Sequence, residues 1–195
     1  MRELDSIHSA ASRFTVAAVA LIATLLGLLH PAAAQIVYTP VDIQIYDSIY
    51  SLDVNNDGIT DFSIASFQGK ICNCKGGGCW HTWGIDETTL GGNGVVGNPP
   101  SPLKLGREIG PKQVFYQGKG YLIYGLVSCG GKLTREGKWG GRNVKTAYLG
   151  LSFQINGETH YGWAEITLNG GVDATLTGYA YEATAGKSLT AGQTH

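Results

Sequence analysis

The chain has 195 residues, and its 14 Lys and Arg residues nearly balance its 15 Asp and Glu residues, giving a net charge of −1. No basic cluster of the kind that grips phosphates occurs, so the charge pattern argues against a nucleic-acid partner. No long apolar segment follows the first 34 residues, so we expect no membrane span in the rest of the chain.

The N-terminal segment has the features of a signal peptide. Arg2 and Arg13 flank its start, residues 14–29 are an apolar stretch, and three alanines ending at Ala34 form a small-residue cleavage site. The sequence therefore predicts a secretory signal peptide helix (residues 1–34), cleaved after Ala34, and secretion to an extracellular or periplasmic space. A membrane anchor is the alternative, but the apolar stretch is short for a span.

The remaining sequence has the signals of an all-β fold. Apolar and polar residues alternate with period two, and glycines cluster between the alternating runs. The predicted strands are 41–53, 61–67, 113–116, 121–128, 146–155, 159–168 and 174–182. The segments 84–112 and 130–143 are predicted to be long surface loops, the first with room for a short strand. We expect a single domain, residues 35–195, folded as an antiparallel, jelly-roll-like β-sandwich.

The first predicted strand leads into the sequence SLDVNNDGITDF, residues 51–62. Alternate positions of a tightly curled loop can point their oxygens at one centre, and calcium prefers about six to eight oxygen ligands. Gly58 permits the sharp turn, because a Cβ there would obstruct it. The sequence predicts a structural calcium site that is formed by Asp53, Asn55, Asp57, the backbone carbonyl of Ile59, and Asp61.

This loop is not an EF-hand, which needs Glu at the twelfth position, where this chain has Ile64, and helices where we predict strands. The pattern resembles the D-x-[DN]-x-D-G-x-x-D loops of integrin-type FG-GAP repeats and thrombospondin type 3 repeats. That resemblance implies that Asp61, which matches the ninth position, is a direct ligand. The alternative is an Asn- and Asp-rich turn that holds no metal.

All four cysteines lie beyond the signal peptide, at Cys72, Cys74, Cys79 and Cys129. An even number of cysteines in an exported chain favours disulfides. Cys72 and Cys74 are too close to bridge, which leaves Cys72–Cys129 with Cys74–Cys79, or Cys74–Cys129 with Cys72–Cys79. A zinc site from the first three cysteines and His81 is the alternative, although this spacing is not a common zinc pattern.

Residues 149–168 place Asn156-Gly157 between two alternating runs. Asn-Gly favours a type I′ hairpin turn, and the turn fixes the register, so the cross-strand pairs follow by counting. The predicted pairs are Ile155 with Glu158, Phe153 with His160, Leu151 with Gly162, Leu149 with Ala164, Ser152 with Tyr161, Gly150 with Trp163, and Tyr148 with Glu165.

Five aromatic residues could share one face of the sheet that this hairpin forms with the last predicted strand. They are Tyr148, Tyr161, Trp163, Tyr179 and Tyr181. One interpretation is a ligand-binding platform on which sugar rings stack. The other is that this face is buried against a second layer, as one face of every strand in a sandwich must be.

Acid–base candidates are present, but no catalytic pattern connects them. They are His81, Glu87, His160, Glu165 and Glu182, and nothing in the sequence fixes the separation that a glycosidase pair requires. No G-x-S-x-G, H-E-x-x-H, phosphate-loop or dinucleotide-binding motif occurs. The sequence therefore predicts no catalytic residue and no enzyme.

The C-terminal part is similar to a group of exported bacterial proteins, many of which end in a PEP-CTERM sorting tag. The segments that carry this resemblance are 148–153, 160–163 (HYGW), 178–182 (GYAYE) and 191–192. Many members also have an Asp/Asn-Gly loop near the N-terminus, as at 53–61. The resemblance implies a secreted β-rich domain and no assigned reaction.

These features together predict a secreted, non-catalytic β-sandwich protein with a structural calcium loop. Its expected role is extracellular or in the envelope, for example in adhesion, with a glycan or cell-surface partner. The first alternative is a carbohydrate-binding module that uses exposed Tyr and Trp side chains. The second alternative is a glycan-active enzyme, which would need a cleft with paired carboxylates.

Overall fold

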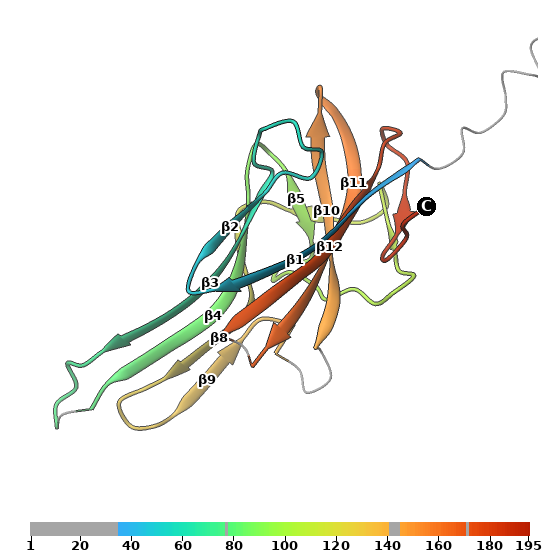
Figure 1. The fold of residues 1–195 in the computed structure, drawn as a ribbon. Helices are drawn as coiled ribbons and strands as arrows, with labels where there is room; N and C mark the ends of the chain where they lie inside the picture. The colour runs from blue at the N-terminus through green and yellow to red at the C-terminus, as the bar shows by residue number, and fades with distance from the viewer. Residues whose placement is uncertain (1–34, 77, 141–144, 171) are drawn as a thin grey trace, which may run out of the picture. The chain divides into compact units, whose positions relative to one another are not determined.

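Two antiparallel sheets make up most of the computed structural model, which describes residues 35–76, 78–140, 145–170 and 172–195 (Figure 1). The expected signal peptide lies outside the described residues. The described residues belong to one compact unit, and no helix among them is long and apolar enough to cross a membrane. The predicted all-β sandwich is confirmed.

The first sheet brings the first and last long strands of the chain side by side. Its strands lie in the order β1–β12–β11–β10–β5–β7. Their bounds are Ile36–Tyr46 (β1), Asp173–Glu182 (β12), Glu158–Asn169 (β11), Thr146–Ile155 (β10), Gly94–Val96 (β5) and Phe115–Tyr116 (β7). The β1–β12 pairing runs from Ile36 opposite Glu182 to Tyr46 opposite Asp173, and it leaves β1 as one edge strand of the sheet.

The second sheet is a meander of five strands in chain order. Their bounds are Ile49–Leu52 (β2), Phe62–Ile71 (β3), Trp80–Thr89 (β4), Lys119–Val127 (β8) and Leu133–Glu136 (β9). A small third sheet pairs β6 (Glu108–Ile109) with β13 (Leu189–Thr190). The connection from β4 to β8 is long and contains β5, β6 and β7, which belong to the other two sheets.

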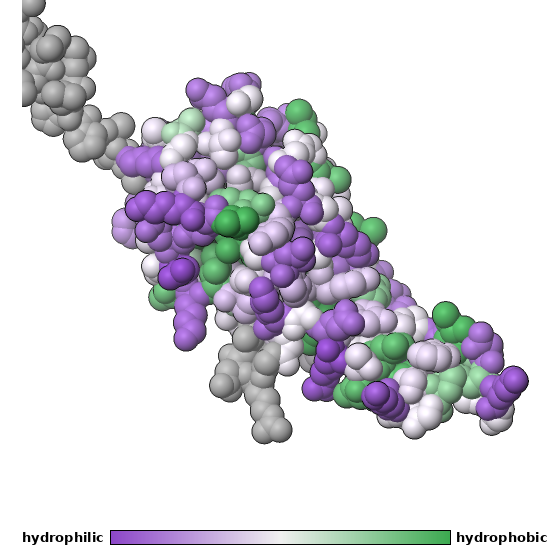
Figure 2. Space-filling model, turned by 180° about the vertical axis from the view of Figure 1, so that it is seen from behind, coloured by the Kyte–Doolittle hydropathy of each residue, from purple (hydrophilic) through white to green (hydrophobic). Residues whose placement is uncertain are grey.

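The far end of the second sheet forms an arm in which β3 and β4 continue beyond the first sheet (Figure 1). Ile71 pairs with Trp80 at the end of these strands. Both side chains and Leu133 of β9 are large, apolar and exposed, and apolar side chains are visible among polar ones at the end of the arm (Figure 2). The arm therefore has no core of its own.

The main core lies between the two large sheets. Its fully buried members come from both, and the largest are Phe62, Phe153, Ile45, Leu52, Ile64, Ile85, Leu122, Leu149, Leu151, Ile166 and Trp139. Each such side chain contributes about 1.5–3 kcal/mol by leaving water. These contacts hold the strands on either side of residues 53–61 in place.

A second apolar cluster covers the outer face of the first sheet. Its buried members are Ile109, Tyr161, Trp163, Ala180, Leu189 and Ala191. Two of them come from β6 and β13, so the small third sheet packs over β11 and β12. Both faces of β11 are therefore buried, which explains its nearly continuous run of buried residues.

The hairpin of β10 and β11 has the predicted register. All seven predicted pairs are present, from Ile155 opposite Glu158 to Tyr148 opposite Glu165. Asn156 and Gly157 have φ angles of 52° and 81°, as a type I′ turn requires. The Asn156-Gly157 turn was therefore enough to predict the register of the β10–β11 pair.

Three predictions about the strands are wrong. The predicted loop 130–143 contains β9, which pairs with β8 over Leu133–Glu136. The predicted strand 41–53 is divided into β1 and β2 by a turn at Asp47, whose φ is 44°. The predicted loop 84–112 contains half of β4, the middle strand of the second sheet. Gly84 reads as a loop residue, yet a Cβ there would lie 2.5 Å from the Ile123 carbonyl oxygen and 2.9 Å from the Phe67 ring, so close packing of strands explains it.

Candidate metal site

The loop 53–61 connects the end of β2 to the start of β3. The Asp61 N–H donates to the Leu52 carbonyl oxygen at 2.9 Å, which closes the base of the loop. The Asp61 carbonyl oxygen accepts from the Leu90 N–H, also at 2.9 Å. The loop is thus fixed at its base, while its middle residues are exposed.

Two carboxylates curl the middle of the loop. The Asp53 carboxylate accepts from the N–H groups of Asp57 and Gly58, at 3.2 and 2.7 Å. The Asp57 carboxylate accepts from the Ile59 N–H at 2.8 Å and from the Asn55 amide at 2.9 Å. Gly58 has a φ of 89°, which a side chain would strain. These hydrogen bonds hold the side chains of Asp53, Asn55 and Asp57 against the backbone of the loop and against one another.

Asp61 is the buried member of the site, with 5% of its surface exposed. Its carboxylate accepts from the Val54 N–H at 2.9 Å and from the Asn93 side-chain amide at 3.0 Å. The Asn93 side-chain oxygen accepts in turn from the Gln154 N–H at 3.2 Å. Asp61 therefore couples the loop to β10 of the opposite sheet through a single buried amide.

The electrostatics of Asp61 reflect this position. Burial raises its pKa, and the nearby carboxylates of Asp53 and Asp57 raise it further. The hydrogen bonds from Val54 and Asn93 act in the opposite direction without cancelling the effect of burial. A cation in the loop would stabilise the ionised form, because opposite charges within a few ångströms favour ionisation.

One atom in the loop fits a cation directly. The Asn55 side-chain oxygen is buried and has no hydrogen-bond partner among the described residues. It lies in the same loop as the carboxylates of Asp53 and Asp57, whose oxygens keep lone pairs beyond the hydrogen bonds that they accept. The donor set is all oxygen, which suits calcium. In the described ranges, however, no three His, Cys, Asp or Glu side chains converge as a ready metal site.

The cysteines form two disulfides, Cys72–Cys79 and Cys74–Cys129. This is one of the two predicted pairings, and it leaves no thiolates for the zinc alternative. Cys72–Cys79 closes the connection between β3 and β4, and Cys74–Cys129 ties that connection to the segment after β8. Disulfides indicate an oxidising, non-cytoplasmic environment.

The five aromatic residues do not share a face, so that prediction is wrong. Trp163 pairs with Ala180, while Tyr179 and Tyr181 pair with Ala164 and Gly162 on the opposite face. A bulge between Glu165 and Ile166 shifts this register, which counting from the hairpin could not reveal.

Burial also removes the predicted aromatic platform. Tyr161, Trp163 and Tyr179 are 8%, 2% and 5% exposed. Tyr148 packs edge-on against Trp163 at 5.3 Å between ring centroids. Burial and then a hydrogen bond to Glu165 raise the pKa of Tyr148 to about 12. Tyr161, Trp163 and Tyr179 therefore serve packing, while Tyr148 and Tyr181 are half-buried and Tyr148 also lines a pocket of about 480 Å³.

Among the acid–base candidates, His160 and Glu182 lie side by side, but their contact runs through the Glu182 backbone oxygen and not through its carboxylate. His160 is buried, and its Nδ1 lies 2.9 Å from the Glu182 backbone oxygen. Glu165 accepts a hydrogen bond from the Thr177 hydroxyl, and His81 is exposed on β4. Glu87 borders a cavity of only about 30 Å³, which is too small for a substrate. Among the described residues, no hydrogen bond or ion pair joins two of these side chains.

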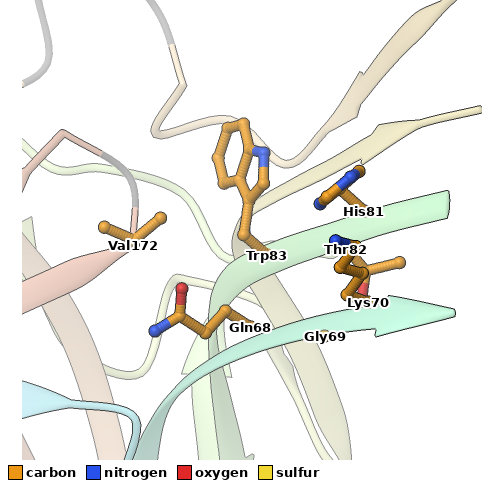
Figure 3. A pocket seen from close by; sticks show the side chains of 7 residues that line it. All are labelled: Gln68, Gly69, Lys70, His81, Thr82, Trp83 and Val172. Carbon is orange, nitrogen blue, oxygen red and sulfur yellow. The ribbon is translucent and has the colours of Figure 1, made fainter. Parts of the chain in front are cut away.

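An open pocket on the second sheet was not predicted. It has a volume of about 420 Å³ and is lined by Gln68, Gly69, Lys70, His81, Thr82, Trp83 and Val172. Figure 3 shows the Trp83 indole standing above β4, with the Gln68 amide on the neighbouring strand and His81 further along β4. No motif marks these residues, because the pocket arises from the side-by-side placement of β3 and β4.

Comparison with known proteins gave no match to a family model, a curated protein or a solved structure. The function must therefore be inferred from the fold and from the two places just described. The loop 53–61 has a defined donor set, and the pocket beside Trp83 has a mixed aromatic and polar lining.

Proposed function

We propose that this protein is an exported, non-catalytic β-sandwich module whose loop 53–61 binds one structural calcium ion. Its role is extracellular or in the cell envelope, as in adhesion. The observation that carries the proposal is the buried side-chain oxygen of Asn55, which has no hydrogen-bond partner among the described residues and whose amide nitrogen donates to the Asp57 carboxylate. The oxidising environment that the two disulfides indicate supports export, as does the resemblance of residues 148–182 to exported bacterial proteins.

The proposed ligands are Asp53, Asn55, Asp57, the Ile59 carbonyl and Asp61. The first three surround the exposed part of the loop, and Asp61 anchors its base. Bound calcium would neutralise the repulsion among the carboxylates. The site lacks a bidentate Glu, so we expect a dissociation constant of about 10⁻⁴–10⁻³ M, as in extracellular modules.

Calcium titration of residues 35–195 tests this proposal. At about 10 mM calcium, binding with that affinity should raise the free energy of unfolding by about 1–3 kcal/mol, because the ligand binds only the folded state. Urea unfolding with and without calcium measures the change. Asp57→Ala should lose it, while Asp42→Ala, at an exposed position of β1, should keep it. No change in the wild-type chain would contradict the proposal.

A second candidate function is carbohydrate binding at the pocket beside Trp83. The specific observation is that an indole lies among amide, hydroxyl, imidazole and ammonium side chains in an open pocket of about 420 Å³, a lining that suits the polar edges and apolar faces of sugars. A glycan array should show binding that Trp83→Ala abolishes and Trp80→Ala, at the end of the arm, retains. Equal binding by both variants would place the glycan elsewhere.

A further inference from the structure

Glu182, at the end of β12, is a buried carboxylate beside the expected cleavage site. None of its surface is exposed. Its Oε1 accepts from the Gln35 N–H at 3.1 Å and from the Thr184 N–H at 2.8 Å. Its Oε2 is also buried, and among the described residues it has no hydrogen-bond partner.

The surroundings keep this carboxylate ionised. Burial acts to raise the pKa of Glu182, but the N–H groups of Thr184 and Gln35, the Thr184 side chain and the positive charge of Lys187 together lower it. A buried carboxylate with an unsatisfied oxygen is costly. The site therefore favours an additional cationic donor.

We propose that cleavage between Ala34 and Gln35 supplies this donor, and that the new α-ammonium group of Gln35 binds the Glu182 carboxylate. This inference rests on the proposed export and processing of the chain. Hydrolysis breaks the Ala34–Gln35 amide bond, and water supplies the oxygen of the Ala34 carboxylate. The Gln35 nitrogen, which as an amide carries one N–H and no charge, becomes an ammonium with three N–H groups and a full positive charge.

The position of the cleavage decides whether the pair can form. The Gln35 nitrogen already lies at hydrogen-bond distance from Oε1, and the Gln35 carbonyl oxygen accepts from the Ala183 N–H at 2.9 Å. Gln35 is thus held from both sides against the end of β12. The two added N–H groups provide a donor for Oε2, so processing completes the hydrogen bonding of Glu182 and fastens the start of β1.

Matched chains test the pairing. One begins at Gln35, released from a cleavable fusion that leaves no extra residue, and the other retains Ala33 and Ala34. A charge-assisted hydrogen bond of this kind should raise the melting temperature of the Gln35 chain by about 4–8 °C over the extended chain. In the Glu182→Gln background the difference should vanish. Equal melting temperatures, or a difference that persists with Glu182→Gln, would overturn the proposal.

A second measurement tests the pairing without the Glu182→Gln variant, and so it remains informative if that variant does not fold. The α-amino pKa of the Gln35 chain, followed by NMR, should lie above its ordinary value of about 8. Lys187 and His160 are the other titratable groups beside Glu182, so selective labelling of Gln35 identifies the signal. An ordinary α-amino pKa would contradict the pairing.

Gln35 also provides an internal control. An N-terminal Gln can cyclise to pyroglutamate with loss of ammonia, which removes the charge. The cyclised chain should melt like the extended one, and mass spectrometry separates the two forms.

The N-terminus of the exported protein tests the processing itself. Gln35 as the first residue supports the processing, whereas another first residue overturns this inference and the processing part of the proposed function. Equal melting temperatures overturn the pairing alone.

Discussion

Asp61 and Glu87 are both buried carboxyl groups, and the protein accommodates them differently. Asp61 accepts hydrogen bonds from Val54 and Asn93. Glu87 is 1% exposed, and its Oε2 has no partner among the described residues. Burial and then the charge of Asp86 raise the pKa of Glu87 to about 8. Burial raises the pKa of both carboxyl groups, but donors offset part of that effect at Asp61, whereas the Glu87 Oε2 has no donor among the described residues.

The largest expected effect on the free energy of unfolding comes from removing the Asp61 carboxylate. Asp61→Ala leaves the Val54 N–H and the Asn93 amide without an acceptor in a buried place. We expect the free energy of unfolding to fall by about 3 kcal/mol, measured by urea unfolding with a calcium chelator present. Asp57→Ala, at an exposed position, is the control and should have a much smaller effect. Equal effects would mean that Asp61 has no special structural role.

The next prediction concerns Glu87 and the change of stability with pH. Because the Glu87 pKa rises from 4.5 to about 8 on folding, the folded state holds the proton more tightly. Its contribution to stability is complete below pH 4.5 and is lost as the pH rises to about 8. Glu87→Gln should therefore unfold at higher urea concentration than wild type at pH 9 and show a flatter pH profile. The exposed Glu158→Gln should retain the wild-type profile, and a Glu87→Gln profile equal to it would contradict the assignment.

The smallest effect concerns the amide that links the loop to β10. Asn93→Ala removes the donor to Asp61 and the acceptor for the Gln154 N–H. We expect a loss of about 2 kcal/mol, less than for Asp61→Ala. A double-mutant cycle of the two substitutions should show strong non-additivity, since they share one hydrogen bond. Additive losses would show that Asn93 does not act through Asp61.

The same contrast explains which features could be predicted from the sequence. The residues of the loop and the pairs around Asn156-Gly157 depend on neighbours in the chain, so local patterns reveal them. Glu87 lies opposite Ile64 and Gly120, and its burial depends on strands far apart in sequence. Nothing near Glu87 in the sequence signals a protonated carboxyl group.

Asn93 and Trp83 illustrate the limits of local patterns in the candidate sites. Asn93 follows two glycines and reads as a turn residue, yet it is 4% exposed and joins the two sheets. Trp83 lies against Gly125 of β8, where any Cβ would come within 2.2 Å of the indole. Both roles arise from tertiary placement, and only the neighbouring strands define them.

The pairing of β1 with β12 has a consequence for the order in which the chain folds. The Gln35 nitrogen and its Glu182 acceptor are 147 residues apart, so the first strand to emerge from a ribosome or a translocation pore must wait for almost the whole domain. Such non-local pairing slows folding. β1 carries Pro40 and an irregularity between Pro40 and Ile43, features that discourage pairing with other chains.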